Sequence, residues 1–306
     1  MTTPPGAPTT SPSASPSASA SASGATVRLR TVDAFTDRPF SGNPAAVVVL
    51  DAGHPRAGDE AWMRGVAAEL NLSETAFAVR GGAPGRYGLR WFTPTVEVDL
   101  CGHATLAAAH VLHADGETGP YVFATRSGDL RAEVGDGGVV LDLPAKPVAP
   151  VDPAGPGADL ADRLAAALAV RVEVCARGGD DVLVEVADEE TVRALVPDLA
   201  ALAAIDARGV VVTAAAAPRP VAEDAALAAP DVVSRFFGPR VGVAEDPVTG
   251  SAHCALAPYW APRLGRTRFT AHQVSPRGGV LEVELRGDRV LLTGRAVTVL
   301  DAQLLA

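Results

Sequence analysis

The organisation of the chain can be read from one segment, Cys101-Gly102-His103-Ala104-Thr105-Leu106-Ala107. Beyond Gly102 the apolar residues recur at the spacing of a helix face, and their small side chains suit close packing inside a domain. The second half of the chain contains a similar segment, Thr249-Gly250-Ser251-Ala252-His253-Cys254-Ala255. Both segments have a Gly-x-Ala core that opens a helix of small or apolar residues. This repeat predicts two related halves, each with one long helix.

Strand patterns surround both helices. Apolar alternation or short apolar runs predict strands in the first half over 27–32, 45–50, 74–79, 88–92, 121–125, 129–134 and 139–143, and in the second half over 172–175, 182–186, 210–214, 232–237, 279–286, 289–295 and 297–300. Further helices are expected between Asp59 and Asn71, which are typical start and stop residues, and over 158–170 and 189–195. Strand-rich halves, each built around one apolar helix, indicate α+β architecture.

Length and composition divide the chain further. The first 24 residues contain no charged residue and, after Met1, consist of Ser, Ala, Pro, Thr and Gly. We expect residues 1–24 to form a disordered, low-complexity tail. The remaining 306 − 24 = 282 residues are enough for two domains of about 150 residues each. Five prolines from Pro144 to Pro156 favour a boundary there, so the predicted domains are 25–143 and 144–306.

Charge and hydropathy exclude some classes of partner. The chain has 26 basic and 36 acidic residues, a net charge of −10, and no basic run, so nucleic acid and anionic membrane surfaces are poor partners. Its apolar stretches, such as Ala45 to Leu50, are far shorter than the roughly 20 residues of a membrane helix. Residues 1–24 lack the early basic residue and the apolar run of a secretory signal. A soluble, cytoplasmic protein is therefore expected.

Several cofactor classes also lack their signatures. The cysteines Cys101, Cys175 and Cys254 are widely separated and odd in number, which argues against a disulfide framework and against clustered zinc ligands. Lys146, the one lysine, precedes Pro147 in a proline-rich stretch and is a poor candidate for a pyridoxal-phosphate Schiff base. No Gly-x-Gly-x-x-Gly motif opens a helix, so a nucleotide cofactor lacks its usual signature. The sequence predicts a protein with neither cofactor nor metal.

Gly102 and Gly250 stand at the predicted starts of the two helices. The first N–H groups of a helix have no partner within the helix and the dipole is positive there, so a carboxylate can bind, and glycine lets it approach closely. The alternative is that these glycines only begin their helices. Ser251 is suited to binding an anion rather than to attack, because residues two apart on a helix point away from each other and it cannot easily pair with His253.

Three ionisable residues near the helix starts are candidates for chemistry. Glu74 lies between a helix stop and an apolar strand, where burial would raise its pKa toward neutrality; the alternative is a solvated, idle glutamate. Asp246 precedes the second helix, where it either takes part in chemistry or forms an Asx-type turn. His103 lies at the mouth of the first helix. His110 and His113 follow without a carboxylate to complete a metal site, so structural roles are favoured for them.

Several motifs together resemble the PhzF family, phenazine-biosynthesis-like isomerases that share the diaminopimelate-epimerase fold. They occur in the family's order and span the chain from about residue 27 to the C-terminus. They are Val32-Asp33-Ala34-Phe35-Thr36 with Ser41-Gly42-Asn43-Pro44-Ala45, Asn71-Leu72-Ser73-Glu74-Thr75-Ala76-Phe77, Arg90-Trp91-Phe92-Thr93-Pro94, Glu97-Val98-Asp99-Leu100-Cys101-Gly102-His103-Ala104-Thr105, and Glu245-Asp246-Pro247-Val248-Thr249-Gly250-Ser251-Ala252.

The resemblance implies a fold and a set of site residues. The fold would have two pseudo-symmetric α+β domains, each a rolled mixed sheet around a central helix, with the active site between them, no cofactor and a homodimeric assembly. The last residues would be able to cross back to the first domain. By this resemblance the catalytic residues are Glu74, His103 and Asp246, and the substrate-binding residues are Asn43, Gly102, Gly250 and Ser251.

The activity implied by the resemblance is a cofactor-independent isomerisation. Glu74 would move a proton within a small cyclic, amino- or hydroxy-carboxylate, which in the phenazine branch of the family is trans-2,3-dihydro-3-hydroxyanthranilate. Two alternatives stay open. One is an amino-acid epimerase on the same fold, in which Cys101 would act as a base but no second thiol stands at the matching place. The other is a catalytically silent protein that binds small carboxylates.

Overall fold

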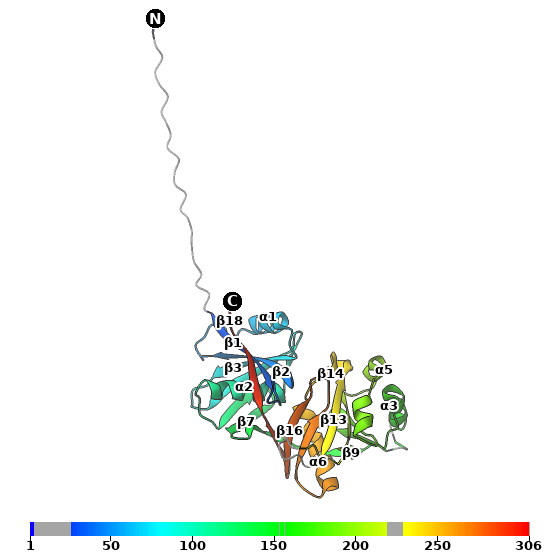
Figure 1. Cartoon of the computed structure of the whole chain (residues 1–306). Coiled ribbons are helices and arrows are strands. Elements are labelled where there is room, and N and C mark those ends of the chain that lie inside the picture. The colour runs from blue at the N-terminus through cyan, green and yellow to red at the C-terminus, as the bar shows by residue number, and fades with distance from the viewer. Residues whose placement is uncertain (3–25, 153, 156, 219–228, 306) are drawn as a thin grey trace.

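The computed structural model describes residues 1–2, 26–152, 154–155, 157–218 and 229–305. These residues form two lobes, one mainly from the first half of the chain and one from the second, and the C-terminal strand lies in the first lobe (Figure 1). The tail expected over residues 1–24 falls almost entirely outside the described residues. Within the described ranges, no helix combines the length and the apolar character needed to cross a membrane.

The first lobe is a mixed sheet around a buried helix. Its elements are β1 (Val27–Ala34), β2 (Asn43–Leu50), α1 (Glu60–Leu70), β3 (Glu74–Arg80), β4 (Arg86–Phe92), β5 (Glu97–Val98), α2 (Gly102–Ala114), β6 (Tyr121–Thr125), β7 (Gly128–Gly135), β8 (Gly138–Pro144) and the C-terminal strand β18 (Ala296–Leu304). The strand order is β18–β1–β2–β3–β4–β6–β7–β8, in which β2–β3 and β4–β6 are parallel and the other pairs antiparallel. Helix α2 is largely buried because its alanine-rich surface lets strands pack closely against it.

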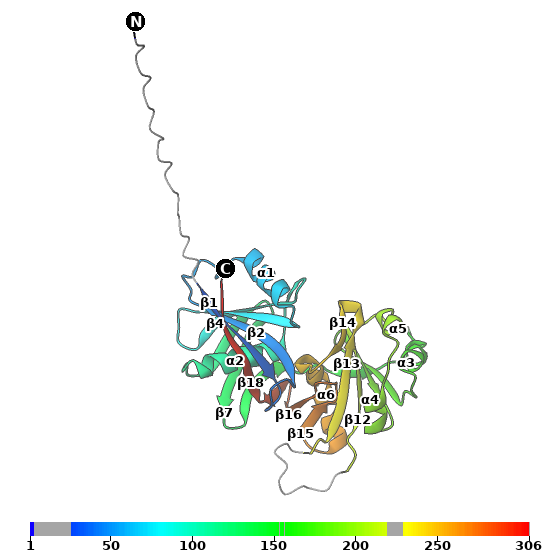
Figure 2. The ribbon, with the colours of Figure 1, turned by 45° about the horizontal axis from the view of Figure 1, so that its top comes forward.

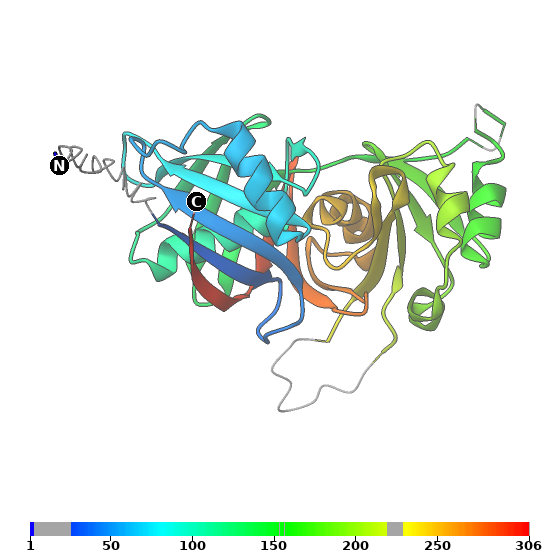
Figure 3. The same cartoon turned by 90° about the horizontal axis from the view of Figure 1, so that it is seen from above.

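The second lobe repeats this plan. Its elements are β9 (Val148–Pro150), α3 (Leu160–Leu168), β10 (Val174–Gly178), β11 (Asp181–Glu185), α4 (Glu189–Ala194), α5 (Leu199–Ala203), β12 (Gly209–Ala215), β13 (Val232–Gly238), a 3-10 helix (Pro239–Val241), β14 (Val243–Asp246), α6 (Gly250–Leu264), β15 (Arg268–Gln273), β16 (Gly279–Arg286) and β17 (Arg289–Gly294). The strand order is β9–β10–β11–β12–β13–β15–β16–β17. Figure 3 shows α6 lying inside the curve of these strands.

One strand pair and one chain crossing join the lobes. Strand β8 pairs antiparallel with β17, and β18 returns to the first lobe to pair antiparallel with β1. The backbone ladder therefore runs from one lobe into the other, with α2 in one and α6 in the other (Figure 2). The domain boundaries at 25–143 and 144–306 stay a prediction.

Elements with strong local signals form where the sequence predicts them. Asp59 accepts a hydrogen bond from the backbone N–H of Trp62 at the start of α1, and Asn71 ends the helix in the left-handed conformation with φ of 50°. The long helices begin at Gly102 and Gly250, as expected. These predictions are confirmed because capping residues and apolar periodicity act within a few residues of each element.

Elements that depend on distant partners differ from the expectation. No strand is predicted in the proline-rich stretch from Pro144 to Pro156, yet β9 forms within it and pairs with β10. Pro150 fits there because β9 lies at the edge of the sheet, where a missing N–H is tolerated. Strand β15 and helix α5 were not predicted. Strand β15 forms because it fits between β13 and β16, a pairing that no local pattern reports.

Gly42 makes the turn that brings Asn43 to the start of β2. Its φ is +65°, and a Cβ there would lie 2.2 Å from the carbonyl oxygen of Ala34. We expect Gly42→Ala to lower the free energy of unfolding in urea by at least about 2 kcal/mol. Gly65→Ala is the control, since Gly65 lies exposed in α1 with open space around it and alanine favours a helix. Equal stability of the two variants would contradict this account.

Candidate active site

Helices α2 and α6 begin against each other. A Cβ built on Gly102 would lie 3.4 Å from the Cα atom of Gly250, and the reverse contact has the same length. Neither N-cap residue, Cys101 or Thr249, bonds the first turn of its helix with its side chain. The N–H groups and positive dipoles of two helix starts therefore converge, which favours binding of an anion between them.

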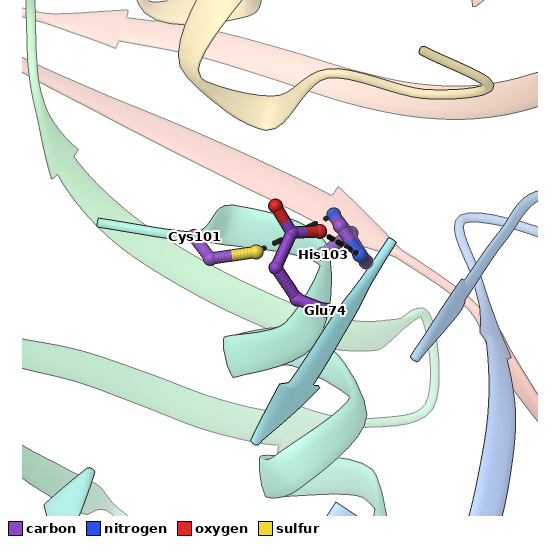
Figure 4. Close-up of side chains that lie close together, drawn as sticks. All are labelled: Glu74, Cys101 and His103. Atoms are coloured by element: carbon purple, nitrogen blue, oxygen red, sulfur yellow. Dashed lines mark hydrogen bonds and ion pairs between the residues drawn. The ribbon is translucent and has the colours of Figure 1, made fainter. Parts of the chain in front are cut away.

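Glu74 lies beside the start of α2 in a cluster with Cys101 and His103. As the first residue of β3, it points its carboxyl group between the thiol and the imidazole (Figure 4). Glu74 Oε2 lies 3.2 Å from His103 Nε2, and Cys101 Sγ lies 3.5 Å from His103 Nδ1. The side chain of Glu74 is 18% exposed and that of His103 only 5%. Water therefore screens these groups little, and their electrostatic interactions are strong.

Asn43 connects this cluster to the second lobe. The residue is fully buried, and its Nδ2 lies 2.7 Å from Asp246 Oδ1, 2.8 Å from the carbonyl oxygen of Val248 and 3.2 Å from His103 Nδ1. Asp246 ends β14 and also accepts a hydrogen bond of 2.5 Å from the hydroxyl of Thr249. A single buried amide thus links the acidic residue of one lobe to the histidine of the other.

The surroundings of His103 decide its protonation. Burial lowers its pKa to about 3, so the imidazole is neutral at physiological pH. Nδ1 lies 3.5 Å from the thiol of Cys101, whose proton it can accept, whereas the two N–H groups of the Asn43 amide have nearer acceptors in Asp246 and Val248. The ring proton then sits on Nε2, which faces Glu74, although the approach does not have the angles of a formed hydrogen bond. His103 can thus offer a proton to a carboxylate without carrying a charge.

The two carboxyl groups have different pKa values. Burial, and then repulsion from Asp246, raises the pKa of Glu74 to about 8. A hydrogen bond with Cys101 and the charge of Arg208 limit this rise. Burial raises the pKa of Asp246 to about 6, and its hydrogen bond from Thr249 is the largest opposing effect. Between these pH values the pair holds one proton, mainly on Glu74.

Cys101 is a thiol in this environment. Burial, and then the charge of Glu74, raises the pKa of Cys101 well above its ordinary value, so the helix start does not produce a thiolate. One donor atom each from Glu74, Cys101 and His103 lie within 4.8 Å of one another, close enough to share a metal ion, but both acidic groups would first have to lose a proton. The residue that matches Cys101 at the start of α6 is Thr249, which supplies no second thiol base.

Ser251 accepts a hydrogen bond from Arg208, a residue that no sequence motif indicates. Arg208 precedes β12, and its Nη2 donates to Ser251 Oγ at 3.0 Å and to Asp181 Oδ2 at 2.5 Å. No motif surrounds Arg208, and its partners lie 43 and 27 positions away in the sequence. A cation beside the serine expected to bind an anion is visible only in three dimensions.

Other histidines of the two helices make separate contacts. His110 Nε2 lies 3.1 Å from the hydroxyl oxygen of Thr298, which fits the structural role favoured for it. His253 Nδ1 lies 2.8 Å from the carbonyl oxygen of Thr249. His253 is therefore engaged with the backbone of its own helix rather than with Ser251.

The sequence matches the phenazine biosynthesis-like protein family, PhzC-PhzF, over residues 32–302. The chain belongs to this family. It is 49% identical over 275 residues to an uncharacterized isomerase of Pseudomonas aeruginosa, with 89% of this chain and 96% of the relative covered. A phenazine biosynthesis protein of the PhzF family from Enterococcus faecalis, of known crystal structure, is 40% identical, with a TM-score of 0.78 over 91% of this chain and 99% of that one. A structure described as a predicted epimerase from P. aeruginosa is 25% identical, with a TM-score of 0.68 over 92% and 99% of the two chains.

These similarities confirm three predictions for this member of the phenazine biosynthesis-like family: the family itself, the α+β fold with epimerase-like neighbours, and the isomerase class. The roles of the individual site residues stay predictions. The structure does bring the predicted side chains and helix starts together at the contact between the lobes. They are Asn43, Glu74, Gly102, His103, Asp246, Gly250 and Ser251.

The protonation of His103 in this phenazine biosynthesis-like protein can be measured directly. We expect ¹H–¹⁵N NMR of protein labelled at histidine to show a neutral ring with the proton on Nε2 from pH 5 to pH 8, because burial keeps its pKa near 3. A His103→Gln variant assigns the signal. Titration of this ring near pH 6, or a proton on Nδ1, would show that the arrangement with Asn43 and Cys101 is wrong.

Proposed function

We propose that this protein is a cofactor-independent isomerase that relocates a proton within a small cyclic carboxylate, with Glu74 as both base and acid. The observation that carries the proposal is the position of Glu74, 3.2 Å from His103 Nε2 and next to the two converging helix starts. A carboxyl group whose pKa is near 8 can accept a proton and release it again near neutral pH.

The proposed reaction moves one proton and one double bond. Ionised Glu74 would take a proton from an activated carbon of the substrate, and the electron pair of the broken C–H bond would delocalise into the neighbouring double bond. The same carboxyl group would then return the proton to another carbon, so a new C–H bond replaces the old one. No electrons leave the substrate, and one residue serves both steps when it is held close to both carbons.

The neighbouring groups would stabilise the charge that develops. The N–H groups near Gly102 and Gly250 would hold the substrate's carboxylate, and Nε2–H of His103 would face the reacting region. Asp246, fixed by Asn43 and Thr249, would accept a hydrogen bond from an amino or hydroxyl group of the substrate. The substrate we propose is trans-2,3-dihydro-3-hydroxyanthranilate or a compound like it.

A deuterium-exchange screen tests the proposal. Wild-type protein in deuterated water should shift the double bonds of trans-2,3-dihydro-3-hydroxyanthranilate, followed by absorbance, and incorporate deuterium into carbon positions, followed by NMR. Exchange with other small amino or hydroxy acids but not with this compound would support the reaction class and reject the substrate. Thermal stabilisation by carboxylates with no exchange of any of them would instead indicate the catalytically silent alternative.

The proposed assembly rests on the family resemblance, and the proposed compartment and partners rest on the composition of the sequence. We propose that the enzyme acts as a homodimer in the cytoplasm, on a small-molecule substrate and without a nucleic-acid or membrane partner. The net charge of −10 supports the absence of a polyanionic partner.

A further inference from the structure

The two helix starts differ in the charges that surround them. Beside the start of α2 lie the carboxyl group of Glu74 and the thiol of Cys101, neither of which supplies a positive charge. The start of α6 carries Ser251, which accepts a hydrogen bond from the guanidinium of Arg208. The acidic end of a substrate would therefore meet a guanidinium and a hydroxyl at the start of α6, while Asp246, which accepts a hydrogen bond from Thr249 there, would face an amino or hydroxyl group of the substrate.

Contacts hold Arg208 in place but use only part of its hydrogen-bond donors. Its Nη2 is used by Ser251 and by Asp181, and its guanidinium lies over the ring of Phe236 at 5.2 Å from the centroid. Within the part of the chain that the structure describes, Nε and Nη1 have no hydrogen-bond partner. The side chain is 35% exposed, so these donors are accessible to a small molecule. Planar guanidinium donors match a carboxylate in geometry and charge.

The partners of Arg208 leave room for a second anion. The side chain of Asp181 is 1% exposed, which makes it a fixed buried counter-ion rather than a ligand that can leave. Ser251 Oγ accepts from Arg208, so its own hydroxyl proton remains available to donate. Ser251 is the second residue of α6, so the free N–H groups of the first turn belong to the same helix start. Three kinds of donor thus converge on one face of the site.

We propose that Arg208, together with the hydroxyl of Ser251, binds the carboxylate of the substrate and makes the enzyme selective for acids over neutral analogues. The proposal rests on the proposed isomerase function, since it assigns the substrate's acidic end to this part of the same site. It also fixes an orientation, with the carboxylate toward α6 and the reacting carbon toward Glu74.

Binding of two matched probes tests this assignment without requiring turnover. Anthranilate and anthranilamide have the same ring and differ in carrying a carboxylate or a neutral amide. We expect wild-type protein to bind anthranilate at least about tenfold more tightly than anthranilamide in isothermal titration at pH 7. Arg208→Gln should weaken anthranilate binding by at least about tenfold and leave anthranilamide binding unchanged. The control is Arg240→Gln, because Arg240 pairs with Asp206 at the surface.

Asp181→Asn separates an anion-binding role from a structural one. This variant keeps the charge of Arg208 and removes its fixed counter-ion, so anthranilate should bind more tightly than in wild type while the binding of anthranilamide stays unchanged. A purely structural ion pair predicts that both variants lose thermal stability and that neither changes the ratio of the two affinities. The Asp181→Asn result also decides the matter if Arg208→Gln does not fold.

Each outcome bears on one proposal at a time. No preference of the wild type for the acid, an unchanged affinity ratio in Arg208→Gln, or no gain in anthranilate affinity in Asp181→Asn would overturn the role of Arg208. Failure of the isomerase proposal would appear as an absence of deuterium exchange, while the preference for the acid persisted.

Discussion

Replacing Glu74 by glutamine is expected to slow the isomerisation at least about a hundredfold. Glutamine has nearly the same shape and can still face Nε2 of His103, but it cannot take up a proton. The loss should appear in kcat, because the variant keeps the donors that would bind the substrate's carboxylate. Initial rates of double-bond migration and of deuterium incorporation provide the measurement.

The pH dependence of the wild-type enzyme provides a second view of the same residue. Because the pKa of Glu74 is raised to about 8, most of the free enzyme carries a proton on this base at pH 7. We therefore expect kcat/KM to rise with pH until about 8, since this parameter reports the ionisation of the free enzyme. A profile that is flat from pH 5 to pH 8 would show that the ionisation of Glu74 does not limit the reaction.

Glu133→Gln is the matched control for the activity measurement. Glu133 lies exposed on β7 of the same lobe, and its replacement makes the same chemical change away from the site. It should retain full activity. More than about one tenth of wild-type activity in Glu74→Gln would rule out Glu74 as the proton carrier.

The parts of the fold that the sequence predicts are those with local causes. Helix α1 was recognised from Asp59 and Asn71, and the residues that cap it act within one turn. Strand β15 has weak strand character in its own sequence, so the sequence does not predict it. It forms because its backbone pairs with β13 on one side and β16 on the other. Local chemistry is present in the sequence, whereas pairing across the chain is a property of the folded sheet.

The candidate site divides in the same way. The sequence shows that Gly102 and Gly250 begin helices. Glu74 by itself does not differ from the many glutamates that are solvated, and only its motif distinguishes it. Burial and the approach of Asp246, which raise the pKa of Glu74, arise from the contact between lobes. Arg208 was not found at all, because its relation to Ser251 exists only after folding.

The buried carboxyl groups should make the protein less stable as pH rises. The pKa of Glu74 is about 8 in the folded chain against 4.5 in the unfolded chain, and that of Asp246 is about 6 against 3.8. Between the unfolded-state and the folded-state pKa of each group, the folded chain therefore holds more protons than the unfolded chain. The stability contributed by the protonated groups is fully present below about pH 4, and it is lost as pH rises through 6 and then 8.

Glu74→Gln should remove most of this pH dependence. Near pH 3.5 the variant and the wild type should have similar free energies of unfolding, because Glu74 is largely neutral in both states of the wild type. At pH 8.5 the variant should be the more stable protein, by up to about 5 kcal/mol, which corresponds to the full shift of the pKa of Glu74. Urea unfolding followed by tryptophan fluorescence at both pH values measures the difference.

The direction of this effect separates two views of Glu74. If the residue stabilised the fold through its contact with His103, the glutamine variant would be less stable at every pH. Glu133→Gln should follow the wild type at both pH values, because Glu133 is exposed. A variant that is inactive yet more stable at pH 8.5 would show that the fold holds a buried carboxyl group at a cost in stability, as expected when a position is kept for chemistry rather than for packing.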